Sequence, residues 1–104
     1  MEISELNNDD LNLFFNSKIE FEENEVGVHW NIKTKIDEYV LHFDLYILPN
    51  HVTISLFKGE RILFSISKEN VKVLKILNEV MRIEFINDGI IEISLNPLKI
   101  KANL

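Results

Sequence analysis

Apolar residues recur at every second position through most of residues 18–66, and this period of two is the feature that most restricts the fold. Successive side chains of a β-strand point to opposite faces of a sheet, so the pattern predicts strands with one apolar and one polar face. Short breaks that are polar or contain proline separate the runs, which together form a five-strand antiparallel meander. The predicted strands are residues 18–23, 25–33, 39–47, 52–57 and 62–66.

The two faces of this predicted sheet differ in character. The apolar face consists of Ile19, Phe21, Val26, Val28, Trp30, Ile32, Tyr39, Leu41, Phe43, Leu45, Ile47, Val52, Ile54, Leu56, Ile62, Phe64 and Ile66. If the strands pair in sequence order, the other face mixes acids with aromatic and hydroxyl side chains. It consists of Glu20, Glu22, His29, Asn31, Val40, His42, Asp44, Tyr46, Thr53, Ser55 and Phe57. If the N-terminal segment packs on this second face, Tyr46 and Phe57 belong to the core instead.

The period changes at Ser67, where residues 67–70 offer a helix N-cap followed by an acid in the first turn. From Val71 to Met81 the apolar residues repeat at intervals of three and four, and lysines occupy much of the opposite side. This spacing is typical of an amphipathic helix. We therefore expect a helix over about residues 68–81 that packs on one side of the sheet.

A β-hairpin is predicted to follow this helix. Its strands are Arg82–Ile86 and Ile90–Leu95, and Asp88-Gly89 between them tolerates the positive φ of a tight type I′ turn. Residues 98–101 then add an edge strand whose two lysines point outward, where they protect the edge from pairing with other molecules.

A short helix is predicted near the N-terminus, over residues 9–16. The polar residues 8–10 can cap it, and the apolar cluster 11–15 is too hydrophobic for a loose tail. A chain of 104 residues suffices for one hydrophobic core, so residues 1–104 are expected to form a single domain. The predicted class is α+β: an antiparallel meander with one amphipathic helix packed on it, a C-terminal β-hairpin and the short N-terminal helix.

Charge is distributed unevenly along the sequence. Residues 1–25 carry eight acids and one lysine, whereas the other 79 residues carry 10 Lys/Arg and 9 Asp/Glu, so the net charge of −6 belongs to the first quarter. An acidic surface of this kind attracts cationic proteins and repels nucleic acid and anionic membranes. We therefore predict a protein partner with a basic surface, no nucleic-acid binding and no membrane association.

The sequence also bears on the cellular location. It contains no cysteine, and its first residues lack the basic and apolar regions of a signal peptide. No apolar run approaches the roughly 20 residues of a membrane-spanning helix. These features predict a cytoplasmic protein with no disulfide and no thiolate metal site.

The motifs of common enzymes are absent from the sequence. No serine lies in a glycine-flanked elbow that could join His29, His42 or His51 in a catalytic triad, and the three glycines stand apart, so no phosphate-binding loop is present. Glu20 and Glu22 could meet His29 and His42 across adjacent strands, and this spacing permits a metal site but is not diagnostic of one. We therefore predict no catalytic residue, no metal ligand and no bound cofactor.

The remaining candidates form a protein-binding site. The acids of residues 20–25 form either a charged edge strand that resists pairing or an anionic docking surface. In the second case the neighbouring aromatic residues complete the interface, because exposed aromatic side chains anchor many protein complexes. The predicted partner-binding residues are Glu20, Glu22, Glu23, Glu25, His42, Asp44 and Tyr46.

These features support three hypotheses about function. The leading one is a non-catalytic protein-binding module, a small acidic inhibitor or immunity-type protein that masks a basic surface of its partner, such as a nuclease toxin. The second is a structural or assembly subunit that forms homodimers or larger homo-oligomers through its sheet. The third is a small-molecule or metal-dependent enzyme, which requires a pocket that contains His29 or His42.

Overall fold

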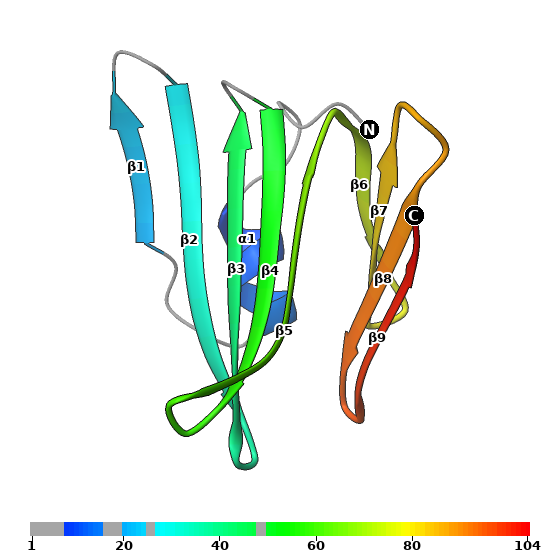
Figure 1. The fold of residues 1–104 in the computed structure, drawn as a ribbon. Coiled ribbons are helices and arrows are strands. Elements are labelled where there is room, and N and C mark those ends of the chain that lie inside the picture. The colour runs from blue at the N-terminus through cyan, green and yellow to red at the C-terminus, as the bar shows by residue number, and fades with distance from the viewer. Residues whose placement is uncertain (1–7, 16–19, 25–26, 48–49) are drawn as a thin grey trace.

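The described part of the chain, residues 8–15, 20–24, 27–47 and 50–104 of the computed structural model, folds into two antiparallel β-sheets and one short helix (Figure 1). The helix is α1 (Asn8–Phe15). The first sheet consists, in spatial order, of β1 (Glu20–Asn24), β2 (Gly27–Ile36), β3 (Tyr39–Ile47), β4 (Asn50–Lys58) and β5 (Arg61–Glu69). The second consists of β6 (Val71–Leu77), β7 (Val80–Phe85), β8 (Ile90–Leu95) and β9 (Leu98–Asn103).

The first sheet confirms the predicted meander, because its strands pair in sequence order. Its apolar face, called here the inner face, is buried, with Ile32, Phe43 and Ile54 wholly inaccessible to solvent. The second strand was predicted to end at residue 33, which is wrong, since β2 continues to Ile36 and Thr34 is a buried strand residue. Of the residues predicted on the apolar face, Ile19 and Val26 lie outside the described residues, and the side chains of Phe21, Val28 and Ile47 are not described.

The helix predicted over residues 68–81 is wrong, and the α+β class is wrong with it. β5 continues to Glu69, and residues 71–77 and 80–85 form two further strands. The molecule is therefore almost entirely β, and a second sheet occupies the place where the amphipathic helix was expected (Figure 1).

Two local features of the hairpin formed by β6 and β7 give its apolar residues the spacing of a helix. The register between β6 and β7 shifts at Lys72, so the buried Val71 and Leu74 lie three residues apart although both belong to one strand. An extra residue in a strand has this effect because it interrupts the alternation of faces. Residues 78–79 then form a two-residue turn in which both φ angles are positive, 52° and 63°, as in a type I′ hairpin.

Asn70 is the single residue between β5 and β6, where the chain passes from the first sheet to the second. Its φ of 64° lies in the left-handed region, which asparagine adopts more readily than most residues. Its backbone N–H donates to the carbonyl of Asn50 at 3.0 Å, and its carbonyl accepts from the N–H of Ile86 at 2.9 Å. The predicted N-cap at residues 67–70 is thus the end of β5 and the corner between the sheets.

The core contains residues from both sheets and from α1. The fully buried members from the second sheet are Leu74, Met81, Ile83, Ile91 and Ile93. The short N-terminal helix is confirmed, and its buried residues Leu11 and Phe15 pack on the inner face of the first sheet. The Phe15 ring lies 5.3 Å from that of Phe43, and the Thr34 hydroxyl donates to the Phe15 carbonyl at 2.9 Å. This placement leaves the opposite face of the first sheet uncovered by the described residues.

The C-terminal hairpin and the last edge strand are confirmed, but the predicted turn is not. The N–H of Phe85 donates to the carbonyl of Gly89 at 2.9 Å, so the connection between β7 and β8 has three residues, 86–88. Only Asp88 within it has a positive φ, of 67°. A three-residue loop with one left-handed residue replaces the type I′ turn expected at Asp88-Gly89. In the described residues α1 is the only helix, and its eight residues are too few to cross a membrane.

Ile62 was predicted on the apolar face, and this prediction is wrong. Leu56 pairs with Phe64, whereas Phe57 pairs with Ile62, so Leu63 is an extra residue in β5. One extra residue reverses the alternation beyond it. Ile62 therefore lies opposite Phe57 on the exposed side of the sheet, and 59% of its surface is accessible.

Candidate functional site

The candidate site is the outer face of the first sheet, which lies opposite α1 and the core. Antiparallel register aligns its residues in rows that cross the strands, so side chains distant in sequence become neighbours. The described side chains of this face belong to His29, Asn31, Lys33, Lys35, Val40, His42, Asp44, Tyr46, His51, Thr53, Ser55, Phe57, Ile62, Ser65, Ser67 and Glu69.

Three rings form a stack at one end of this face. His29 lies directly opposite Tyr46, and Tyr46 lies directly opposite His51. The ring centroids are 3.9 Å apart in the first pair and 4.4 Å in the second, with interplanar angles of 8° and 9°. We call His29, Tyr46 and His51 the aromatic row. Because the rings stack face to face, a partner can reach only their edges, which carry the ring nitrogens of the histidines and the hydroxyl of Tyr46.

A hydrogen bond fixes one end of the aromatic row. His29 Nε2 lies 3.1 Å from Asp44 Oδ1, and 15% and 25% of the two side chains are exposed. An ionised carboxylate can only accept, so His29 donates the proton in this bond. Asp44 thereby holds the imidazole in one orientation and keeps it stacked on Tyr46.

Acid positions lie at both ends of the aromatic row and in the row next to it. By register, Glu22 lies opposite His29 and Glu69 lies opposite His51, so the row has an acid position at each end. Glu20 lies opposite Asn31 in the adjacent row, which also contains Asp44. The row and these four acid positions are the acidic end of the outer face.

The remaining predicted site residues are not all brought to this end. Glu23 pairs with Val28, outside the rows of the acidic end, and Glu25 lies outside the described residues. His42 lies four residues from Tyr46 along β3, and its ring is 4.5 Å from that of Phe57. The structure thus groups Glu20, Glu22, Asp44 and Tyr46, and it places His42 farther along the face.

The other end of the outer face is apolar. Val40 lies opposite Phe57, and Phe57 lies opposite Ile62. We call these three residues the apolar end. A hydroxyl pair, Ser55 with Ser65 at 2.8 Å, lies between the apolar end and the row of Asp44, and a second pair, Thr53 with Ser67 at 3.0 Å, lies in that row.

Among the residues of this face that the sequence analysis did not place on it are His51, Glu69 and Ile62. His51 preceded the predicted strand 52–57, Glu69 belonged to the predicted helix, and Ile62 was predicted on the apolar face. The run Ile62-Leu63-Phe64 contained a signal, because three consecutive apolar residues break strict alternation and indicate an extra residue in the strand. The positions of His51 and Glu69 depend on how far β4 and β5 extend, and strand ends are poorly marked in the sequence.

The outer face of the second sheet differs, because its charges pair with one another. Arg82 lies 3.8 Å from Glu84 and 3.9 Å from Glu92, and Lys75 lies 3.8 Å from Glu84. Half-exposed pairs of this kind stabilise a fold little. They do neutralise one another's charge locally, and Lys99 and Lys101 on β9 add positive charge to this face, in contrast to the acidic end.

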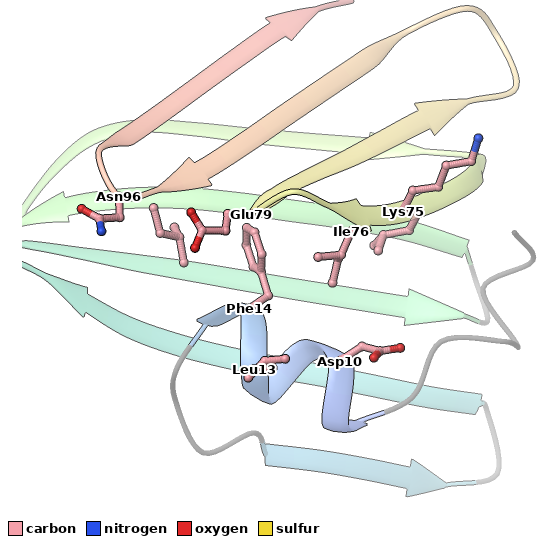
Figure 2. Close-up of a pocket in the computed structure, with 9 residues that line it drawn as sticks. Asp10, Leu13, Phe14, Lys75, Ile76, Glu79 and Asn96 are labelled. Atoms are coloured by element: carbon pink, nitrogen blue, oxygen red, sulfur yellow. The ribbon is translucent and has the colours of Figure 1, made fainter.

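A cavity of about 770 Å³ opens between α1 and the second sheet (Figure 2). Its lining residues are Asp10, Leu13, Phe14, Leu74, Lys75, Ile76, Glu79, Leu95 and Asn96. The enzyme hypothesis required a pocket with His29 or His42, and this cavity contains neither. Within the described residues no group of three His, Cys, Asp or Glu side chains is placed to hold a metal ion. The arrangement of the outer face suits contact with another protein, since it combines fixed aromatic rings with a polar surround.

Comparison with solved structures identifies a chain of the same fold. It belongs to the contact-dependent growth inhibition toxin–immunity protein complex from Klebsiella pneumoniae 342. The match has a TM-score of 0.80 and covers 94% of this chain and 93% of that chain, at 18% sequence identity. No family model matches the sequence, and a search of curated proteins finds no match. The similarity extends over nearly all of both chains and, at this identity, shows a shared fold.

Proposed function

We propose that this protein is an immunity-type inhibitor, a non-catalytic protein that binds a toxin and blocks its action. The observation that carries the proposal is the fold match with a chain of a toxin–immunity complex over nearly the full length of both chains. The outer face of the first sheet supplies a surface for such binding, because it presents aromatic, acidic and apolar side chains that the described core does not use.

Charge favours the immunity role over the toxin role within such a complex. A nuclease toxin binds phosphates and needs clustered Lys and Arg, whereas this protein has a net charge of −6. An inhibitor of such a toxin associates with it faster and more specifically when it carries the opposite charge. We therefore propose that the partner is a toxin with a basic surface, and that the two proteins meet in the cytoplasm.

Self-association is the second candidate, and the geometry of the outer face opposes it. If two copies met face to face with like ends together, Asp44 and Glu69 of one copy would approach the same carboxylates of the other. In the reverse orientation the acidic end would cover the apolar residues Phe57 and Ile62. Neither orientation matches apolar with apolar and charge with opposite charge. We therefore propose a monomer that binds a different protein, and sedimentation velocity measures this directly.

Copurification from the native host tests the proposed function. The tagged protein is purified at low salt, and the proteins that copurify are identified by mass spectrometry. Each one is then produced in a bacterial host with and without this protein. We expect one of them to arrest growth when alone and to be harmless when coproduced. If no copurifying protein is toxic, or if coproduction gives no protection, the proposal fails.

A further inference from the structure

We infer that the partner binds both ends of the outer face at once, with basic side chains at the acidic end and an apolar side chain at the apolar end. This inference rests on the proposed function for the class of the partner. It adds the chemistry of the partner surface and a separate role for each end. Association rate should depend on the acidic end, and the lifetime of the complex should depend on the apolar end.

The dimensions of the outer face suit the centre of a protein interface. The segment from Tyr46 to Val40 along β3 spans about 20 Å, and the five strands span about 19 Å from first to last. This area is about half of the roughly 800 Å² that each partner buries in a standard interface. The two ends are therefore close enough to bind one partner and far enough apart to contact different side chains of it.

The acidic end is pre-organised for binding. Stacking holds Tyr46 between two histidines, and the hydrogen bond that His29 donates to Asp44 fixes the His29 ring. Side chains that are already immobile lose little entropy when a partner arrives. No Lys or Arg occupies the rows of Tyr46 and Asp44, so their carboxylates at Asp44 and Glu69 are complementary to a basic surface.

At the apolar end, Ile62 is exposed because Leu63 is an extra residue in β5. If Leu63 were regularly paired instead of extra, it would lie opposite Phe57, and Ile62 would alternate to the inner face with Phe64. Bulges are known to redirect a side chain near functional sites. Ile62 is 59% exposed and continues a row with Phe57 and Val40, and a contiguous apolar row on the surface is typical of a contact with another protein.

Each hydroxyl oxygen of the two pairs already has one hydrogen-bond partner. Thr53 and Ser67 hydrogen-bond each other, as do Ser55 and Ser65. Such groups can lie under an interface without leaving buried polar atoms unsatisfied. The binding energy is therefore expected to concentrate at the ends, as in interfaces where few residues dominate.

Binding kinetics of purified variants test this inference, with the copurifying protein as the probe. The acidic-end variant carries Asp44→Asn and Glu69→Gln, and the apolar-end variant carries Ile62→Ser. Matched controls on the second sheet are Glu92→Gln and Leu77→Ser, since Leu77 is 71% exposed. Association and dissociation rates are measured at about 50 and about 500 mM NaCl, below and above the physiological ionic strength of ~150 mM.

We expect the acidic-end variant to associate about threefold to tenfold more slowly at low salt, with a weaker salt dependence and little change in dissociation. We expect Ile62→Ser to dissociate about tenfold faster with the salt dependence unchanged. The two controls should match the parent protein. Loss of binding in the controls but not in the outer-face variants would place the partner on the second sheet and overturn the inference.

The proposed function and this inference can fail separately. If the copurifying protein is toxic and coproduction protects, but neither outer-face variant alters binding, the inference fails and the proposed function stands. If the partner is not a toxin, the proposed function fails, and the kinetics still decide how the face is used. A stable homodimer that Ile62→Ser dissociates would also overturn the inference, because a second copy would then occupy the face.

Discussion

Asn50 holds Val71 through both groups of its side-chain amide. Its Nδ2 donates to the Val71 carbonyl at 2.8 Å, and its Oδ1 accepts from the Val71 N–H at 3.2 Å. These two bonds resemble the pair that a neighbouring antiparallel strand would form. They fix the start of β6 to the start of β4, beside the corner at Asn70, and so set the second sheet against the first.

Removal of this amide should destabilise the fold. Asn50→Ala leaves two partly buried backbone groups of Val71 without their partner, which costs about 1–3 kcal/mol. Urea unfolding followed by circular dichroism gives the free energy of unfolding. Asn103→Ala, at an exposed position near the end of β9, is the control and should change it by less than about 0.5 kcal/mol. Equal stabilities for the two variants would contradict a clamping role for Asn50.

Because Asn70 has a left-handed φ, the stability of variants at this position should depend on the backbone preference of the new residue. Asn70→Gly should leave stability nearly unchanged, because glycine adopts a φ of 64° without strain. Asn70→Val should lower the free energy of unfolding by about 1–2 kcal/mol, because a β-branched residue is strained there. Thermal and urea unfolding compare the two. A stable Val variant would show that the corner does not require this conformation.

The extra residue in β5 predicts that substitution by alanine destabilises the fold at Ile54 but hardly at Ile62. Ile54 is wholly buried, so Ile54→Ala should cost about 2–5 kcal/mol. Ile62 is 59% exposed, so Ile62→Ala should cost at most about 0.5–1 kcal/mol. Urea unfolding of both variants measures the difference. A large loss at Ile62 would mean that this residue points into the core, as simple alternation suggests.

The link between α1 and β2 depends on one buried hydroxyl. Thr34→Val keeps the shape of the side chain but removes the donor to the Phe15 carbonyl, and should lower stability by about 1–3 kcal/mol. Hydrogen exchange should accelerate in α1 before the strands. Thr53→Val is the matched control, because Thr53 bonds only at an exposed position on the outer face. Unchanged exchange in α1 would show that other contacts hold the helix.

The candidate site was predictable as far as alternation allowed. Because side chains alternate along a strand, the sequence predicts that Asp44 and Tyr46 share one face. Pairing of the strands in sequence order then brings the acid positions of β1 close to them. Alternation alone could not place His51 or Glu69, because their roles follow from the true ends of β4 and β5. It also assigned Ile62 to the wrong face, since one inserted residue reverses the pattern.

The sequence by itself determined the first sheet, the short N-terminal helix, the last hairpin and the uneven distribution of charge. Each of these depends on local periodicity or on composition, which every residue carries wherever it is placed. Only the tertiary structure decided the state of residues 71–81, where a bulge at Lys72 and a turn at residues 78–79 produced helical spacing from strands. The apolar face of the first sheet must be covered, and a second sheet covers it here through contacts between residues far apart in sequence. Such contacts outweigh a local preference that is worth only tenths of a kcal/mol per residue.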